Sequence, residues 1–257
     1  MIDNTAFKKE LEERVKEINA GIAGYLPEEK GCQKTIFEAM NYSMNAGGKR
    51  LRPLLMQEVC RLFTGEVSEI VKPFMAAIEM IHTSSLVHDD LPCMDDDMIR
   101  RGKASTWAEY GEDIGVLAGD ALMMYAFETA SKAFDAAEDA DALLRAGKAM
   151  GILAAKTGVY GMIGGQTVDV ELAGGPVPKD KLDFIYRLKT GALLQAAMLI
   201  GAVLGGAADE DCKIVEDLAG KVGLAFQIQD DILDVTGDAS VTGKAAGSDE
   251  KNQKTTY

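Results

Sequence analysis

Two short stretches of the sequence concentrate carboxylate side chains. The first, HDDLPCMDDD at residues 88–97, contains Asp89, Asp90, Asp95, Asp96 and Asp97. The second, QIQDDILD at residues 227–234, sets Asp230 and Asp234 one helical turn apart on one face, with Gln227 one turn earlier. Carboxylates this dense repel one another unless a cation joins them, so both stretches favour cation binding.

The ligand atoms in these stretches indicate which cation would bind. Oxygen ligands without histidine or cysteine favour Mg²⁺, with Mn²⁺ as an alternative, over Zn²⁺. Mg²⁺ usually takes only one or two carboxylates and completes its shell with water and phosphate oxygens. Two facing clusters would therefore clamp a diphosphate through several metal ions. The competing interpretation, a pair of solvated acidic helix ends, is disfavoured because apolar segments lead into both clusters and a buried unpaired carboxylate is costly.

Three other segments carry cationic side chains that could meet a phosphate. They contribute Lys49 with Arg52, Arg100 with Arg101, and Lys189 beside Thr190. Converging Lys and Arg side chains form phosphate sites, and Arg can donate two parallel hydrogen bonds. Each segment alone would be interpreted as solvated surface charge. The presence of all three segments in the same chain as the two aspartate clusters favours phosphate binding.

A Glu-x-x-His pair, Glu79 with His82, raises a di-iron helical bundle as an alternative. That kind of site needs the pair twice. The only other histidine is His88, and the residue three positions before it is Ser85. The di-iron interpretation therefore fails. His82 lies two helical turns before Asp89, which suits a hydrogen-bond donor on the substrate side, whereas a satisfied interior histidine is the alternative.

Helical periodicity runs along almost the whole chain. Apolar residues recur at three- and four-residue spacing, as in Phe7, Leu11 and Val15. The expected helices are 5–22, 33–45, 51–63, 68–91, 114–134, 141–158, 179–189, 191–206 and 209–235. Strand patterns are nearly absent and no low-complexity linker divides the chain, so one all-α domain is expected. The polar residues 236–257 are expected to form a mobile loop.

Composition narrows the function classes. The chain has 257 residues and a net charge of −14, which excludes general binding of nucleic acid or anionic membranes. Its four cysteines form no C-x-x-C pair, so a reducing cytoplasm is expected rather than a disulfide framework or zinc ribbon. Residues 191–208 carry no charge, yet their Gly and Ala content favours a buried core helix over a membrane span. The charged amphipathic N-terminus lacks the apolar core of an export signal.

Five motifs follow one another from about residue 30 to the end of the chain. They are GGKRLRP, IHTSSLVHDDLPCMDDDMIRRGK, GGQTVDVE, KTGALL and GLAFQIQDDILDVTGD. In order and spacing they resemble the trans-prenyl (polyprenyl) diphosphate synthases, most of all the bacterial short-chain members that make farnesyl or geranylgeranyl diphosphate. The resemblance implies a single-domain, all-α helical bundle around a deep central cavity, with the aspartate motifs on opposite walls. It also implies a homodimer.

The resemblance implies a reaction as well. The family uses Mg²⁺ to condense isopentenyl diphosphate head-to-tail (1′-4) with dimethylallyl, geranyl or farnesyl diphosphate. Two rivals are a class I terpene synthase, which needs no isopentenyl site, and a non-catalytic helical scaffold. The intact GGKRLRP and QIQDDILD motifs argue against the first, and the two complete aspartate clusters argue against the second. Family members usually continue with further helices beyond the K-x-T-Y segment at 254–257, so residues 1–257 are expected to be a domain without those helices.

Site roles follow from the resemblance position by position. The metal ligands, for three Mg²⁺ ions, are Asp89, Asp90, Asp95, Asp230, Asp231 and Asp234. The allylic diphosphate is bound by Arg100, Lys189 and Lys244, and isopentenyl diphosphate by Lys49, Arg52, His82 and Arg101. Lys189, Thr190 and Gln227 line the reacting centre, and Lys254 belongs to a closing lid. The role of Gln166 and Asp169, in the G-Q-x-x-D motif, is less definite.

Product length depends on the residues before the first aspartate. In the family, bulky residues four and five positions earlier form a floor that stops the growing chain. Here those positions hold Ser85 and Ser84, which slightly favours a twenty-carbon product. Met123, Met124 or Phe127 could supply the floor instead, so a fifteen-carbon product stays equally open.

Overall fold

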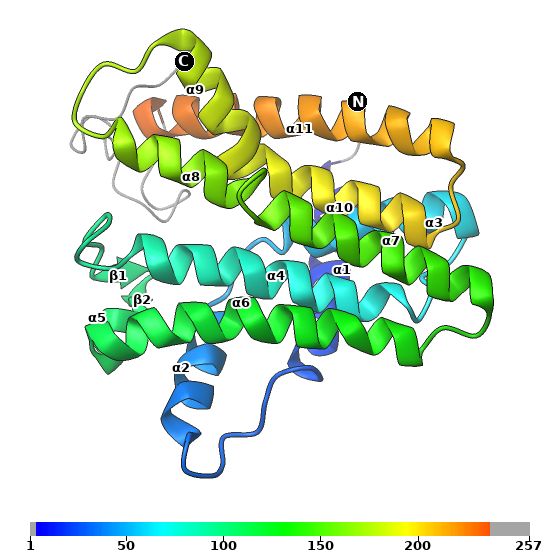
Figure 1. Ribbon diagram of the computed structural model, residues 1–257, viewed down its shortest axis with the longest axis horizontal. Coiled ribbons are helices and arrows are strands. Elements are labelled where there is room, and N and C mark those ends of the chain that lie inside the picture. The colour runs from blue at the N-terminus through cyan, green and yellow to red at the C-terminus, as the bar shows by residue number, and fades with distance from the viewer. Residues whose placement is uncertain (1–3, 237–257) are drawn as a thin grey trace.

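Helices make up nearly all of the structure in the computed structural model, which describes residues 4–236 (Figure 1). The helices are α1 (Asn4–Ala23), α2 (Lys34–Met44), α3 (Leu51–Thr64), α4 (Val71–Asp89), α5 (Thr106–Tyr110), α6 (Glu112–Asp135), α7 (Ala140–Thr157), α8 (Met162–Glu171), α9 (Lys179–Ile185), α10 (Gly191–Leu204) and α11 (Asp209–Thr236). The expected all-α class is confirmed. The expected loop at 236–257, with Lys244 and Lys254, lies outside the described residues.

Two helices and one hairpin were not expected from periodicity. The short helices α5 and α8 carry few buried residues, so their apolar pattern is weak. The expected helix at 179–189 is in fact α9 followed by a π-helical turn, η1 (Tyr186–Thr190). The expected start of α4 at 68 was also wrong, since the helix begins at Val71 and ends at Asp89.

The core is built around α4 and α10. Helix α4 packs along α6, and α10 packs against α3, α7 and α11. Every residue of α10 except Gln195 is buried. The segment 179–204 is long and apolar enough to cross a membrane, and 72% of its most apolar window is buried inside the protein. Burial in a helical core accounts for its composition, as expected.

A two-stranded hairpin follows α4 and places two arginines. Strands β1 (Ile99–Arg100) and β2 (Lys103–Ala104) are antiparallel, with Arg100 opposite Lys103. Both turn residues have positive φ, 53° at Arg101 and 76° at Gly102, as a type I′ turn requires. Strands of two residues are too short to give an alternating pattern, which explains why the sequence did not reveal them.

The elements that carry the motifs gather at one end of the molecule. Figure 1 shows the hairpin, α8, α9 and the C-terminal end of α11 on the same side. The opposite end holds the start of α11 and the end of α10. This arrangement brings motifs far apart in sequence toward one another. All four cysteines are free, in keeping with the expected absence of a disulfide framework.

Candidate active site

The first aspartate motif wraps around the C-terminal end of α4. Asp89 is the last residue of that helix. The amide of Asp95 donates to the carbonyl of Asp89 at 2.9 Å, and the amide of Asp97 donates to the carbonyl of Asp90 at 3.1 Å. These bonds fold the loop back on the helix end. The carboxylates of the motif are therefore held close to one another.

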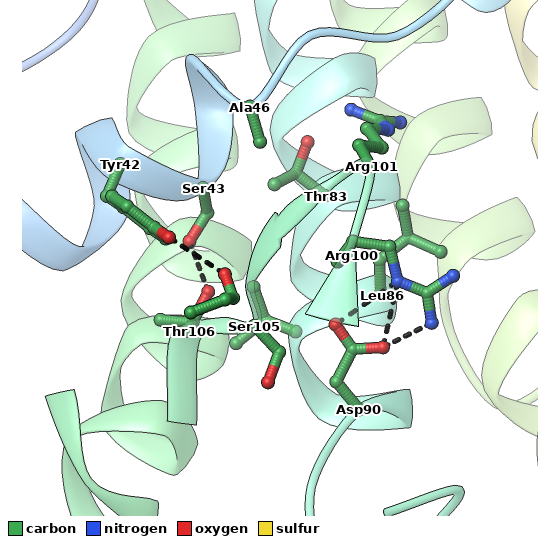
Figure 2. Close-up of a pocket in the computed structure, with 12 residues that line it drawn as sticks. Tyr42, Ser43, Ala46, Thr83, Leu86, Asp90, Arg100, Arg101, Ser105 and Thr106 are labelled. Carbon is green, nitrogen blue, oxygen red and sulfur yellow. Dashed lines mark hydrogen bonds and ion pairs between the residues drawn. The ribbon is translucent and has the colours of Figure 1, made fainter. Parts of the chain in front are cut away.

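Asp90 holds Arg100 in place. The Nε atom of Arg100 donates to Oδ1 of Asp90 at 2.9 Å (Figure 2). Its Nη2 atom donates to Asp97 at 3.2 Å. Burial raises the pKa of Asp90, and the hydrogen bonds from Arg100 oppose that rise. A buried carboxylate needs such a partner. In this arrangement Asp90 holds Arg100 in position. The roles of Asp90 as a metal ligand and of Arg100 in the allylic site stay predictions.

Helix α8 connects the first motif to Lys189. Gln166 donates from Nε2 to Oδ1 of Asp89 at 2.7 Å. One turn later on α8, Asp169 accepts from Nζ of Lys189 at 2.6 Å. Burial lowers the pKa of Lys189, but the charges of Asp89, Asp169 and Asp95 outweigh it and raise the pKa above its ordinary value. The G-Q-x-x-D motif, whose role sequence reasoning left open, holds Asp89 through Gln166 and Lys189 through Asp169.

Close backbone packing allows this connection. A Cβ atom added at Gly165 would lie 2.3 Å from the backbone nitrogen of Lys189. Only glycine lets α8 approach η1 this closely. A π-helical turn inserts one extra residue and often marks a functional site. Here it lets the neighbours Lys189 and Thr190 reach different helices, α8 and α11.

The second aspartate motif is fixed by a chain of hydrogen bonds. Thr190 donates from Oγ1 to Oε1 of Gln227 at 2.9 Å, and Gln227 donates from Nε2 to Asp231 at 3.0 Å. The hydroxyl of Tyr186 donates to the other oxygen of Asp231 at 2.8 Å. Asp231 is buried, whereas Asp230 is exposed. Asp230 is therefore the accessible carboxylate, and Asp231 supports Gln227.

Two further points concern this motif. The side chain of Asp234 lies outside the described part of α11. Tyr186 was missed by sequence reasoning, because a lone tyrosine on an amphipathic helix gives no signal of a buried carboxylate partner.

A separate cluster of arginines surrounds the start of α3. Arg50, which sequence reasoning passed over, has φ of 48° and donates to Glu79 at 2.8 Å and to the carbonyl of Met44 at 2.6 Å. Glu79 is thereby assigned to an ion pair, which removes the remaining half of the di-iron motif. Arg101 donates to the carbonyl of Gly47. Its guanidinium lies 2.7 Å from the position that a Cβ would take at Gly48, whose φ of 131° favours glycine.

The predicted isopentenyl-site residues share one electrostatic environment. Burial lowers the pKa of Arg52 to about 10, against the attraction of Glu79. Burial, followed by the charges of Arg52 and Arg101, lowers the pKa of His82 well below its ordinary value. His82 is therefore neutral at pH 7. The Nε atom of Arg52 is buried and has no partner among the described residues. A bound anion would supply that partner and offset the mutual repulsion.

Lys49, the fourth predicted residue, lies exposed one residue before Arg50. A small cavity of about 20 Å³ lies between this cluster and the first motif (Figure 2). Thr83 and Ser105 line it, and the hydroxyl oxygen of each is buried without a partner in the described chain. The cavity has room for about one water molecule.

The expected floor residues present little bulk. Ser84 is fully buried and donates to the carbonyl of Ile81, and Ser85 donates to the carbonyl of His82. Met124 is 69% exposed, whereas Met123 and Phe127 pack against the core. Of the three alternatives on α6, Met123 and Phe127 suit a floor within this chain.

Within residues 4–236, no three His, Cys, Asp or Glu side chains are grouped closely enough to hold a metal ion on their own. The chain offers one or two oxygen ligands at a time, and substrate phosphates would have to supply the rest. This is the usual way in which Mg²⁺ is held in phosphate-handling sites.

Comparison with known proteins identifies the family. The family model described as polyprenyl synthetase matches residues 33–257. The chain belongs to the polyprenyl synthetase family. Its α4 and α11 aspartate motifs and its arginine cluster all fall within the matched range.

Individual members of this family are similar to the chain. A farnesyl diphosphate synthase of Geobacillus stearothermophilus is 40% identical over 247 residues, which cover 96% of this chain and 82% of that protein. A heterodimeric geranylgeranyl pyrophosphate synthase large subunit of Arabidopsis thaliana is 46% identical over 225 residues, covering 86% of this chain and 60% of that protein. The chain thus matches less than two thirds of the plant relative's length.

A solved structure shares the fold. The geranyltransferase of Helicobacter pylori, complexed with magnesium and isoprenyl diphosphate, superposes with a TM-score of 0.80 at 32% identity. The similarity covers 96% of this chain and 80% of that one. The expected isoprenoid synthase fold is therefore confirmed.

Proposed function

We propose that this polyprenyl synthetase condenses isopentenyl diphosphate 1′-4 with an allylic diphosphate, giving farnesyl or geranylgeranyl diphosphate. The observation that carries the proposal is the pairing of two unlike walls around the end of α4. We call the carboxylates of α4 and α11, taken together, the carboxylate wall, and Arg52, Arg101 and neutral His82 the cationic wall. The names of the two similar synthases support the same reaction.

The carboxylate wall would hold the allylic diphosphate through Mg²⁺. Asp89 and Asp95 on one side and Asp230 on the other supply only oxygen ligands, which suit this ion. We assign three ions to the site, with Mn²⁺ as an alternative. The magnesium in the Helicobacter pylori structure supports this choice of metal. Asp90 and Asp231 would act by positioning Arg100 and Gln227.

The cationic wall would hold isopentenyl diphosphate. Arg52 has a buried, unpartnered Nε atom, and Arg101 is fixed by its bond to the carbonyl of Gly47. His82, being neutral, can donate one hydrogen bond without adding to the positive charge. Lys49 is exposed at the mouth of this wall, where it can contact the same diphosphate.

Ionisation of the allylic C–O bond starts the reaction. Bound Mg²⁺ would supply Lewis-acid stabilisation of the departing diphosphate. Arg100, held by Asp90, and Lys189, held by Asp169, are preorganised donors for the charge that develops there. The double bond of isopentenyl diphosphate then attacks the allylic carbon, and the resulting cation loses a proton to the released diphosphate.

The cation formed in this reaction needs protection from water. Oγ1 of Thr190 and Oε1 of Gln227, joined by a hydrogen bond of 2.9 Å, would stabilise this cation through their dipoles. Lys244 and Lys254, beyond the described residues, remain predicted as the allylic-site and lid lysines. Closure of their segment would exclude water from the site.

We further propose that two copies of the chain associate in the cytoplasm. Helix α6 exposes Val116, Leu117 and Met124 at 39%, 53% and 69% of their surface. Apolar side chains gathered on one helix are typical of an interface. The four free cysteines support a reducing compartment.

A product assay tests the proposed reaction. The purified chain is incubated with Mg²⁺, isopentenyl diphosphate and, in turn, dimethylallyl, geranyl or farnesyl diphosphate, and the dephosphorylated products are separated by chromatography. Elongation of at least one primer is expected, and it should vanish in the Asp89→Ala variant. Cyclised hydrocarbon formed without isopentenyl diphosphate would indicate a terpene synthase instead.

A further inference from the structure

A second cavity opens at the end of the bundle opposite the aspartate motifs. Its volume is about 580 Å³, and residues of α7, the end of α10 and the start of α11 line it. Figure 1 shows the end of α10 and the start of α11 at this end of the bundle. Cys212 lines it, and Cys212 and Asp230 are 18 residues apart on α11. At 1.5 Å per residue that separation is about 27 Å. The cavity is therefore distinct from the site described above.

The floor of the cavity is apolar. Ile152 and Ala155 of α7 and Leu199 and Val203 of α10 line it. Gly151 and Gly206 also line it. The volume falls in the range of about 300–1,000 Å³ that small-molecule sites occupy. A hydrocarbon chain of modest length would fit such a floor.

The rim of the cavity is cationic. Arg145, Lys148, Lys156 and Lys213 line it, against only Asp209 and Glu216 among its acidic residues. This local excess of positive charge stands out in a chain whose net charge is −14. Lys and Arg gathered at one opening are suited to a phosphate or carboxylate head.

The cations of the rim are engaged to different degrees. Lys156 donates to Gln195 at 2.9 Å and to Glu216 at 2.8 Å, so it braces α7 against α10 and α11. Lys148 makes a looser pair with Asp209 at 3.6 Å. The Nε atom of Arg145 is buried without a partner among residues 4–236. An anion at the rim would meet Arg145 and Lys148 without breaking the brace.

We propose that this cavity binds a small amphiphilic anion, a hydrocarbon chain that ends in a phosphate or carboxylate group. The apolar floor receives the chain, and Arg145, Lys148 and Lys213 receive the head. Either a prenyl phosphate or a short acyl carboxylate has this chemistry. The proposal concerns a binding site separate from the reacting centre, and it does not depend on the reaction proposed there.

A cavity-filling variant tests the site directly. A Cβ atom at Gly151 meets no atom within 4 Å, so Gly151→Trp can place its ring in the cavity. Gly147, one turn earlier on α7, is equally open but does not line the cavity, and Gly147→Trp is the matched control. Equilibrium dialysis with labelled farnesyl diphosphate and Mg²⁺ counts the molecules bound per chain.

The expected counts separate the two sites. The unmodified chain and Gly147→Trp should bind two molecules per chain, and Gly151→Trp should bind one. If the aspartate site does not take prenyl diphosphates, the counts fall to one, one and none, and the cavity proposal still holds. Counts of labelled farnesyl diphosphate and of labelled dodecanoate that are both unchanged in Gly151→Trp, with its helix content intact, would overturn the proposal.

A charge-reversal pair tests the role of the rim without filling the cavity. Lys148→Glu with Lys213→Glu should weaken binding at the cavity about tenfold or more. The control pair Lys72→Glu with Lys221→Glu makes the same change in charge at exposed positions away from the cavity. Equal binding by the two double variants would contradict a cationic head-group site.

Ligand analogues define the chemistry of the occupant. Farnesol lacks the head and inorganic diphosphate lacks the chain, and each should bind at the cavity about tenfold more weakly than farnesyl diphosphate. Inorganic diphosphate binding as tightly as farnesyl diphosphate would overturn the amphiphile proposal. Tighter binding of dodecanoate than of farnesyl diphosphate would assign an acyl carboxylate, and the reverse order a prenyl phosphate.

Discussion

At the residue scale, neighbouring aspartates have different hydrogen-bond partners and different burial. Asp89 and Asp90 are adjacent, yet Asp89 accepts from Gln166 on α8 whereas Asp90 is buried against Arg100. The same division separates exposed Asp230 from buried Asp231. The sequence identifies both clusters as carboxylate-rich. It cannot tell which aspartates in each cluster are buried and which are accessible, because that depends on which side of a helix end faces the core.

Substitution of His82 should change how stability depends on pH. The pKa of His82 in the folded chain lies well below the ordinary value of 6.5, so below pH 6.5 the unfolded chain takes up a proton that the folded chain excludes. The free energy of unfolding should therefore fall as pH drops from 6.5 toward 5, by up to about 1.4 kcal/mol per pH unit from this group. Denaturant titrations of the unmodified chain and His82→Gln measure it. Equal slopes in the two proteins would contradict the assignment.

Enlarging Ser84 should shorten the product. The side chain is fully buried and its hydroxyl donates to the carbonyl of Ile81. Ser84→Tyr adds a ring where the growing chain would pass, so the ratio of fifteen- to twenty-carbon product should rise severalfold in the chromatographic assay. If the distribution stays unchanged, the floor is set elsewhere, with Met123→Phe and Phe127→Ala as the next variants.

At the element scale, the π-helical turn η1 links the helices of the site. It connects α9 to α10 and sends Lys189 toward α8 and Thr190 toward α11. Periodicity predicts one helix over 179–189, because a single extra residue in a turn leaves the apolar pattern nearly intact. The hairpin that carries Arg100 and Arg101 was likewise invisible, since its register depends on a two-residue turn.

A small change at Gly165 should disturb the packing of α8 against η1. A Cβ atom there would lie 2.3 Å from the backbone of Lys189, so Gly165→Ala must push η1 away from α8. We expect a loss of about 1–3 kcal/mol in the free energy of unfolding. A fall in kcat/KM should accompany it, because Lys189 and Asp169 separate.

Gly147→Ala is the control for this prediction. Gly147 is helical with nothing within 4 Å of its Cβ position, so alanine should stabilise the chain by about 0.5–1 kcal/mol. Thermal unfolding and steady-state kinetics of both variants provide the measurement. A Gly165→Ala protein as stable and active as the control would show that the close approach is unimportant.

At the scale of the whole molecule, the acidic chain handles anions through localised cations. Its net charge of −14 excludes general polyanion binding. Near the start of α3, however, burial lowers the pKa of Arg52 and of His82, and the charge of Arg101 adds to both shifts. The helical class, the motif residues and eight of the helices, α1 to α4, α6, α7, α10 and α11, could be predicted from the sequence, because periodicity and motif spacing are local. Arg50, Tyr186 and the bond from Gln166 to Asp89 could not, because they depend on long-range contacts.

The central claim is that two walls bind two different diphosphates, and a double dissociation tests it. Isothermal titration calorimetry with Mg²⁺ measures isopentenyl diphosphate and the unreactive S-thiolo analogue of dimethylallyl diphosphate on two variants. The affinity of Asp89→Ala for the analogue should fall at least about tenfold, while its affinity for isopentenyl diphosphate stays unchanged. The affinity of Arg52→Ala for isopentenyl diphosphate should fall by a similar factor, while its affinity for the analogue stays unchanged. Equal loss of both ligands in each folded variant, or loss of neither, would contradict the two-wall account.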